Sequence, residues 1–188
     1  MRVVLASGNP NKLRELGASL PGWTLEPLGT HCSEEEGSTY EENARAKARF
    51  ARGLVSPHAW TLGEDSGLEV DGLGGRPGVL SARYPGPGED PVAKLLAELE
   101  GVSGGGRRAR YVCELVLVSP EGDERRGTGV LEGSIAREAR GTEGFGYDPV
   151  FVPAGEAHAV AELGNEWKRA HSHRARAAAA LLKAVATL

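Results

Sequence analysis

The chain has 188 residues, of which 40% are hydrophobic and 26% charged, proportions that are ordinary for a globular protein with a sizeable core. Its net charge of −4 argues against broad coating of a nucleic-acid backbone, and no apolar run approaches the length of a membrane span. The two cysteines, Cys32 and Cys113, lack metal-ligand spacing and predict reduced thiols in a cytoplasmic protein. We therefore expect one domain over residues 1–188, with neither a nucleic-acid polymer nor a membrane as partner.

The first segment predicts a strand, a tight loop and a helix. An apolar run over residues 2–6 leads into Ser7 and Gly8, and leucines then recur at helical spacing. Asn9 suits the N-cap of this helix, and Pro10 suits its first position. Lys12 then falls in the first turn, where free N–H groups and a positive end charge favour a phosphate. The alternative is a simple turn between strand and helix, because such junctions are common.

A second helix is predicted over residues 40–54. Thr39 and Glu42 form a capping box, and the acidic run before them is typical of a solvated face or cap. Asn43 and Lys47 lie four residues apart and share one side of this helix. They could reach a phosphate from there; the alternative is partial burial, with the ammonium group reaching solvent.

A glycine-rich stretch over residues 63–87 follows a short strand-like run. It opens with two adjacent acids, Glu64 and Asp65, whose charges repel unless both are solvated or a cation lies between them. A second acidic pair, Glu69 and Asp71, alternates with apolar residues, as in a short strand with one polar face. The alternative interpretation is a turn-rich loop with solvated acids.

The middle of the chain predicts a helix and a hairpin. Asp90 and the following proline open a helix that runs to about Leu99, and residues 103–106 are predicted to form a flexible joint. The clearest strand of the protein covers residues 109–118, and a turn joins it to a partner strand over 125–135. The sheet is therefore expected to be mixed.

The last third carries two further motifs. Phe145, Tyr147 and Phe151 gather in a chain with few aromatics, which favours a stacking site for a base or, alternatively, a packed core turn. An alanine-rich helix then begins after Ser172 and runs to about residue 186. Two cations stand in its first turn, His173 and Arg174, where the helix dipole disfavours them; this predicts a ligand or a carboxylate partner nearby.

Five motifs in order resemble the inosine triphosphate pyrophosphatase family: SGNPNK, EEGSTYEENARAKA, EDSGLEVDGLGGRPGVLSARY, FGYDPVF and AEL…EWKRAHSHR. The resemblance extends from residue 3 to about residue 182. It implies an α/β fold with a long twisted mixed β-sheet, flanking helices and two lobes around a central cleft. It also implies a homodimer, dependence on Mg²⁺, and hydrolysis of non-canonical purine nucleoside triphosphates such as ITP, dITP and XTP.

The resemblance also implies roles for individual residues. Asp65 matches the proton acceptor and metal-site acid, and Glu35 is assigned as the second metal ligand, with Glu34 and Glu64 as alternatives. Substrate-binding roles fall on Ser7, Gly8, Asn9, Pro10, Asn11, Lys12, Ser66, Phe145, Gly146, Tyr147, Asp148, Lys168, His173 and Arg174, and Asn43 and Lys47 are added for their place on the second helix.

These roles predict a mechanism and a basis for base selection. Water attacks the α-phosphorus and pyrophosphate leaves, while Asp65 either accepts the proton of the water or only holds the metal. Arg174 can donate to the C6 oxygen of hypoxanthine or xanthine and would oppose the amino group of adenine. Two alternatives are a non-catalytic nucleotide sensor and a related pyrophosphatase for modified pyrimidine triphosphates.

Overall fold

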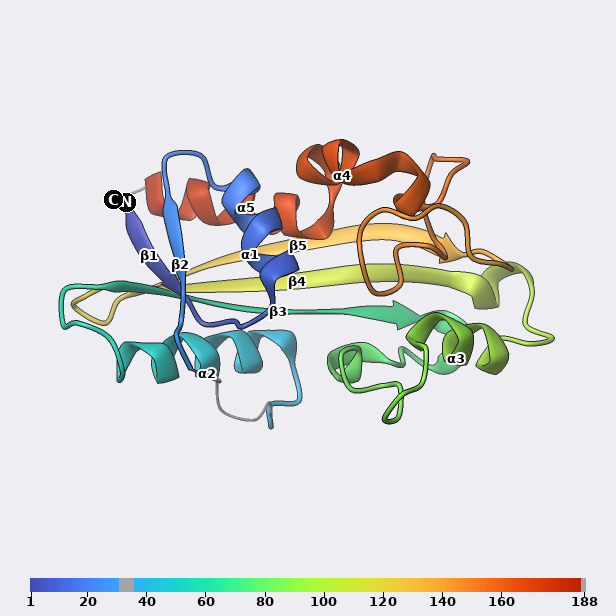
Figure 1. Cartoon of the computed structure of the whole chain (residues 1–188), viewed down its shortest axis with the longest axis horizontal. Coiled ribbons are helices and arrows are strands. Elements are labelled where there is room, and N and C mark those ends of the chain that lie inside the picture. The colour runs from blue at the N-terminus through green and yellow to red at the C-terminus, as the bar shows by residue number, and fades with distance from the viewer. Residues whose placement is uncertain (31–35, 187–188) are drawn as a thin grey trace. The chain divides into compact units, whose positions relative to one another are not determined.

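The computed structural model describes residues 1–30 and 36–186. Within these ranges the chain forms a mixed six-stranded sheet in the order β2-β1-β3-β4-β5-β6. β1 pairs in parallel with both β2 and β3, whereas β5 and β6 pair antiparallel. The expected α/β fold with a mixed sheet and flanking helices is therefore confirmed (Figure 1).

Contacts between Cα atoms divide the chain into two compact units. The first unit comprises residues 1–65, 113–129 and 172–188, and the second comprises residues 66–112 and 130–171. Three strands contribute residues to both units: β3 (Trp60–Val70), β4 (Arg108–Val118) and β5 (Glu124–Ile135).

The first unit adds two strands and three helices to its share of these strands. They are β1 (Arg2–Leu5), α1 (Pro10–Ser19), β2 (Thr24–Pro27), α2 (Tyr40–Arg52) and α5 (His173–Ala186). Within this unit α1 and α5 cover one face of the sheet and α2 covers the other (Figure 1). Leu5, Leu62 and Leu115 lie in its core with no exposed surface, packed against buried residues of α1 and α5.

The predicted helix starts of this unit are confirmed by their hydrogen bonds. The side chain of Asn9 accepts from the backbone N–H groups of Asn11 and Lys12, with Pro10 in the first helical position. Thr39 and Glu42 form the complete capping box at the start of α2. These caps fix the directions in which both helices leave their loops.

The second unit has its own core and its own helices. Its further elements are α3 (Pro91–Glu98), β6 (Phe151–Pro153), α4 (Val160–His171) and 3-10 turns over Asp71–Leu73, Gly78–Leu80 and Gly104–Arg107. Its core joins Leu68 and Val70 of β3 to Leu95 of α3, to Phe151 of β6 and to the preceding Val150. No helix in the described part of the chain is both long and apolar enough to cross a membrane.

One alternative interpretation of the sequence and one expectation about local structure differ from what is observed. β3 continues without interruption through Glu64 and Asp65 to Val70, so the adjacent acids lie in a strand and not in a turn-rich loop. The predicted flexible joint is a 3-10 turn, because the buried side chain of Arg107 donates to the carbonyl oxygens of Leu99 and Ile135. These bonds tie the turn to the second unit.

Candidate active site

β3 directs its two adjacent acids to opposite faces of the sheet, because successive side chains of a strand alternate. Glu64 contacts residues of α1 and α5, whereas Asp65 contacts residues of α2. The alternation separates the two carboxylates that the sequence places side by side. Each one meets a lysine on its own face, and this arrangement removes the expected repulsion.

Glu64 is fully buried among cations. Its Oε2 lies 2.6 Å from the Lys12 Nζ, and its Oε1 accepts from the Arg174 Nε at 3.1 Å. Burial alone would raise the pKa of Glu64, but the charges of Lys12, Arg174 and Lys47 hold the pKa well below its ordinary value. These cations therefore favour the ionised form of Glu64.

The buried Cys113 thiol lies next to this group, with its Sγ 3.8 Å from the Glu64 Oε1. Burial raises the pKa of the thiol, so Cys113 stays protonated and can act only as a weak donor. The expected free thiol is observed at Cys113, and Cys32 lies outside the described residues.

Arg174 has the carboxylate partner that its place in the first turn of α5 predicts. Besides Glu64, it donates from Nη1 to the Glu15 Oε2 at 3.1 Å, and both side chains are buried. Sequence reasoning missed Glu15. The signal was available, because Glu15 follows Lys12 by three residues and therefore shares its face of α1.

Asp65 is held from the opposite face by α2. The Lys47 Nζ lies 2.8 Å from its Oδ1, and the Asn43 Nδ2 donates to its Oδ2 at 3.1 Å. Lys47 also donates to the carbonyl oxygen of Glu64 at 3.1 Å. Asn43 and Lys47 therefore contact the same group, as their spacing on α2 allows. In the structure this group is the carboxylate of Asp65, whereas the sequence analysis considered a phosphate.

A glycine makes this contact possible. A Cβ atom at Gly63 would lie 1.8 Å from the carbonyl oxygen of Ala44, so only glycine lets α2 approach β3 this closely. Gly63 is two residues before Asp65 and faces the same side of the strand. The close approach brings Asn43 and Lys47 within reach of Asp65.

The oxygen donors of this site suit a metal that also binds its substrate. No group of three or more acidic, histidine or cysteine side chains in the described ranges is arranged to hold a metal ion. Mg²⁺ commonly uses one or two carboxylates and takes its other ligands from phosphate and water. Asp65 fits that role. The assigned ligand Glu35 and its alternative Glu34 lie outside the described residues.

The second unit holds the other predicted site residues around Asp148. The Lys168 Nζ lies 2.6 Å from the Asp148 Oδ2 and 4.7 Å from the centroid of the Phe145 ring. The Phe145 N–H donates to the same carboxylate oxygen at 2.9 Å, and the Tyr111 hydroxyl lies 3.3 Å from the Asp148 Oδ1. Asp148 thus fixes a half-buried aromatic ring and a buried cation together.

Only part of the aromatic cluster is available for stacking. Tyr147 and Phe151 belong to the core of the second unit, and the Tyr147 hydroxyl donates to the carbonyl oxygen of Ser81 at 3.1 Å. Burial also raises the pKa of Tyr147. Phe145 is half-buried, and among these three rings it is the one that retains substantial exposure. Ser66 begins the second unit directly after Asp65 and is half-buried.

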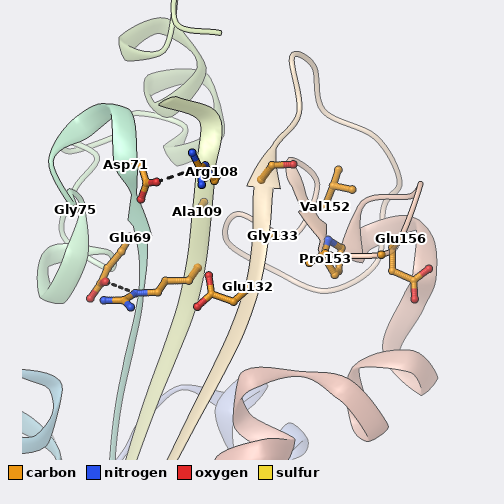
Figure 2. Close-up of a pocket in the computed structure, with 14 residues that line it drawn as sticks. Glu69, Asp71, Gly75, Arg108, Ala109, Glu132, Gly133, Val152, Pro153 and Glu156 are labelled. Atoms are coloured by element: carbon orange, nitrogen blue, oxygen red, sulfur yellow. Dashed lines mark hydrogen bonds and ion pairs between the residues drawn. The ribbon is translucent and has the colours of Figure 1, made fainter. Parts of the chain in front are cut away.

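A hollow of about 760 Å³ lies elsewhere in the second unit, and none of the predicted site residues lines it (Figure 2). Glu69 pairs with Arg110 at 2.7 Å, and Asp71 lies 4.0 Å from Arg108. Each of these acids therefore has an arginine beside it. Glu69 alternates with buried leucine and valine residues, so it lies on the polar face that the sequence predicts for this strand. Glu132 and Glu156 also line the hollow, so its lining carries more acids than arginines and does not suit a triphosphate.

Comparison with known proteins agrees with the motifs. Residues 3–184 match the Ham1 family. A dITP/XTP pyrophosphatase of Symbiobacterium thermophilum is 46% identical over all of this chain and 96% of its own length, and one of Thermus thermophilus is 44% identical over 98% and 91%. The solved structure of a HAM1 protein from Coxiella burnetii covers the whole of both chains with a TM-score of 0.85 at 35% identity. The chain belongs to the Ham1 family.

Proposed function

We propose that the protein hydrolyses non-canonical purine nucleoside triphosphates, ITP, dITP and XTP, to the monophosphate and pyrophosphate. One observation carries the proposal: two lysines face two adjacent buried acids, Glu64 and Asp65, in a chain that aligns over its full length with dITP/XTP pyrophosphatases. A non-catalytic nucleotide sensor has no need for a buried carboxylate at Asp65, so this geometry favours an enzyme.

The first unit supplies the groups for the triphosphate. Ser7, Gly8 and Asn9 lead into α1, whose first three residues are Pro10, Asn11 and Lys12. Lys47 lies on α2. The described ion pairs are balanced, because Lys12, Lys47 and Arg174 face Glu64, Asp65 and Glu15. A triphosphate carries about four negative charges, so a charge-balanced site calls for an added cation.

Mg²⁺ is the cation that we propose, with Asp65 and Glu35 as its protein ligands. When bound, it neutralises the charge that develops on the phosphates. Asp65 either accepts the proton of the attacking water or only holds the metal. Asn43 donates to Asp65 and orients its carboxylate in both cases.

The second unit supplies the groups for the nucleoside. Phe145 offers a half-exposed ring for stacking, and Lys168 lies buried beside it on Asp148. Gly146 is exposed next to this ring and leaves room for a ligand. We also assign substrate contacts to Ser66 and Tyr147 of this unit and to His173 and Arg174 of the first unit. Arg174 and Tyr147 are hydrogen-bonded within the protein as well.

Two properties of the whole protein belong to the same proposal and rest on the family resemblance. We propose that the protein is a homodimer and that it acts in the cytoplasm. The mass of the purified protein in solution, measured by light scattering against the 19.8 kDa chain, tests the first of these.

A panel assay tests the function directly. Purified protein is incubated with Mg²⁺ and ITP, XTP, dITP, GTP, ATP or UTP, and monophosphate and pyrophosphate are both measured. We expect rapid turnover of ITP, XTP and dITP and slow turnover of the others. Equal rates on all six would contradict the proposed selectivity, rapid turnover of UTP alone would favour a pyrimidine enzyme, and no product from any would favour a sensor.

The Asp65→Asn variant identifies the centre of the reaction. The substitution removes one charge and keeps the shape of the side chain, so we expect the fold to persist and ITP turnover to fall by about 10²- to 10⁴-fold. Circular dichroism checks the fold, and initial rates of pyrophosphate release check turnover. Glu26→Gln, which removes an exposed acid from β2, is the control and should keep the wild-type rate. Near-wild-type turnover by Asp65→Asn would exclude Asp65 from the reaction.

A further inference from the structure

Lys47 holds the carboxylate that the proposed metal needs. Its ammonium nitrogen lies 2.8 Å from the Asp65 Oδ1, and both residues are buried, at 6% and 3% exposure. The other oxygen of Asp65 accepts from Asn43, and the backbone of α2 is fixed close to β3 by Gly63. The cation on Asp65 is thus part of a packed and directional arrangement.

A divalent metal and an ammonium group compete for one carboxylate. A metal ligated by Asp65 would lie within a few ångströms of the Lys47 nitrogen, and two cations at that distance repel strongly in a buried site. The lysine has a flexible four-carbon stem and three donors, so it can leave the carboxylate and donate elsewhere. The phosphates of the substrate are the acceptors that the proposed function brings to this site.

We propose that Lys47 is a resident counter-ion that neutralises Asp65 in the metal-free protein and moves to the triphosphate when the metal binds. This inference rests on the proposed function and deepens it by giving one residue two successive partners. It has a distinctive consequence. Lys47 opposes the binding of metal alone, and it favours the binding of triphosphate once metal is present.

Removal of Lys47 therefore changes two affinities in opposite directions. In Lys47→Met, calorimetry with Mn²⁺ and no nucleotide should show metal binding tightened by about 10-fold or more, because a competing charge-assisted bond is lost. Calorimetry with preformed manganese tripolyphosphate should show binding weakened by about 10- to 100-fold. Neither measurement depends on turnover.

Lys183→Met is the matched control, because Lys183 is exposed near the end of α5 in the same unit and its loss removes the same charge. We expect it to change both affinities by less than about twofold. If Lys47→Met weakens the binding of Mn²⁺ as well as that of tripolyphosphate, Lys47 has only a structural role. The proposed exchange, in which Lys47 leaves Asp65 for the triphosphate, is then excluded.

A second variant covers the case in which Lys47→Met does not fold. Asp65→Asn keeps the size of the side chain but removes the charge that retains Lys47. In excess chelator, its affinity for tripolyphosphate should exceed that of the wild type by about 10-fold, because the lysine no longer leaves an ion pair. The double variant with Lys47→Met should lose this gain. No gain in Asp65→Asn would overturn the exchange.

The outcomes separate this inference from the proposed function. A protein that hydrolyses ITP but shows the same sign for both affinities keeps the proposed function and loses the exchange. A protein that shows the opposite signs but hydrolyses none of the nucleotides keeps the exchange and loses the proposed function.

Discussion

Lys12 is paired with the buried Glu64 in the structure. Its proposed role as a phosphate ligand can be tested by comparing ligands with and without phosphates. Lys12→Ala should weaken the binding of ITP with Mg²⁺ by about 1.5–3 kcal/mol, the usual contribution of a charge-assisted hydrogen bond. Binding of inosine, which lacks phosphates, should be unchanged. Calorimetry with both ligands measures the difference.

The control for Lys12 is a neighbour on the same helix. Arg14→Ala removes an exposed cation two residues away and should affect neither ligand. If inosine and ITP are weakened equally by Lys12→Ala, the lysine serves to neutralise Glu64 and does not contact the phosphates.

Arg174 has two candidate roles, and one ratio separates them. If its guanidinium donates to the C6 oxygen of the base, Arg174→Ala should lower the ratio of kcat/KM for ITP over ATP by about 10- to 100-fold. If it acts only through its buried pairs with Glu64 and Glu15, both substrates should slow by the same factor. The loss of a buried pair should also destabilise the fold by about 3–5 kcal/mol, which urea unfolding measures.

The contact of α2 with β3 is the element on which the site depends. Gly63→Ala would place a methyl group 1.8 Å from the carbonyl oxygen of Ala44, so the helix must move away from the strand. We expect a loss of at least about 1–3 kcal/mol in the free energy of unfolding, the usual cost of overpacking. We also expect a fall in ITP turnover, because Asn43 and Lys47 move with the helix.

Gly17→Ala is the matched control for this prediction. Gly17 lies in α1, is exposed, and has open space where a Cβ atom would stand. Alanine in a helix interior is about 1 kcal/mol better than glycine, so this variant should be more stable than the wild type. Equal stability of the two variants would show that the distance between α2 and β3 is not critical.

Elements with a clear start or a clean alternation could be predicted from the sequence. Asn9 with Pro10, and Thr39 with Glu42, marked the starts of α1 and α2 because their side-chain bonds are local. α4 was not predicted. Gly164, with a φ of 84°, has a non-helical backbone and divides α4 into two short helical runs. Neither run is long enough to show a clear helical periodicity in the sequence.

The sequence predicts which residues belong to the candidate site, but not which of them contact each other. Asp65, Lys12 and Lys47 were named from motifs, yet their pairing depends on which helix covers which face of β3, and no local signal contains that. The buried Arg107 shows the same limit. Glycines around it predicted flexibility, whereas its bonds to distant carbonyl oxygens fix the turn.

The whole molecule has two units but shares its three longest strands between them, which bears on how it unfolds. β3, β4 and β5 each continue from one unit into the other, so unfolding of one unit leaves frayed ends on three strands of the other. We therefore predict a single cooperative unfolding transition, in contrast to two domains that melt separately.

The tryptophans allow each unit to be followed alone. Trp23 and Trp60 lie in the first unit and Trp167 in the second, so Trp167→Phe reports on the first unit and the double variant Trp23→Phe/Trp60→Phe reports on the second. In each protein, the urea midpoint from fluorescence should equal the midpoint from far-ultraviolet circular dichroism, which reports on the whole chain. Because the comparison is made within one protein, any stability change caused by the substitutions cancels. A fluorescence midpoint that departs from the dichroism midpoint would show that the units unfold separately, and that the shared strands do not couple them.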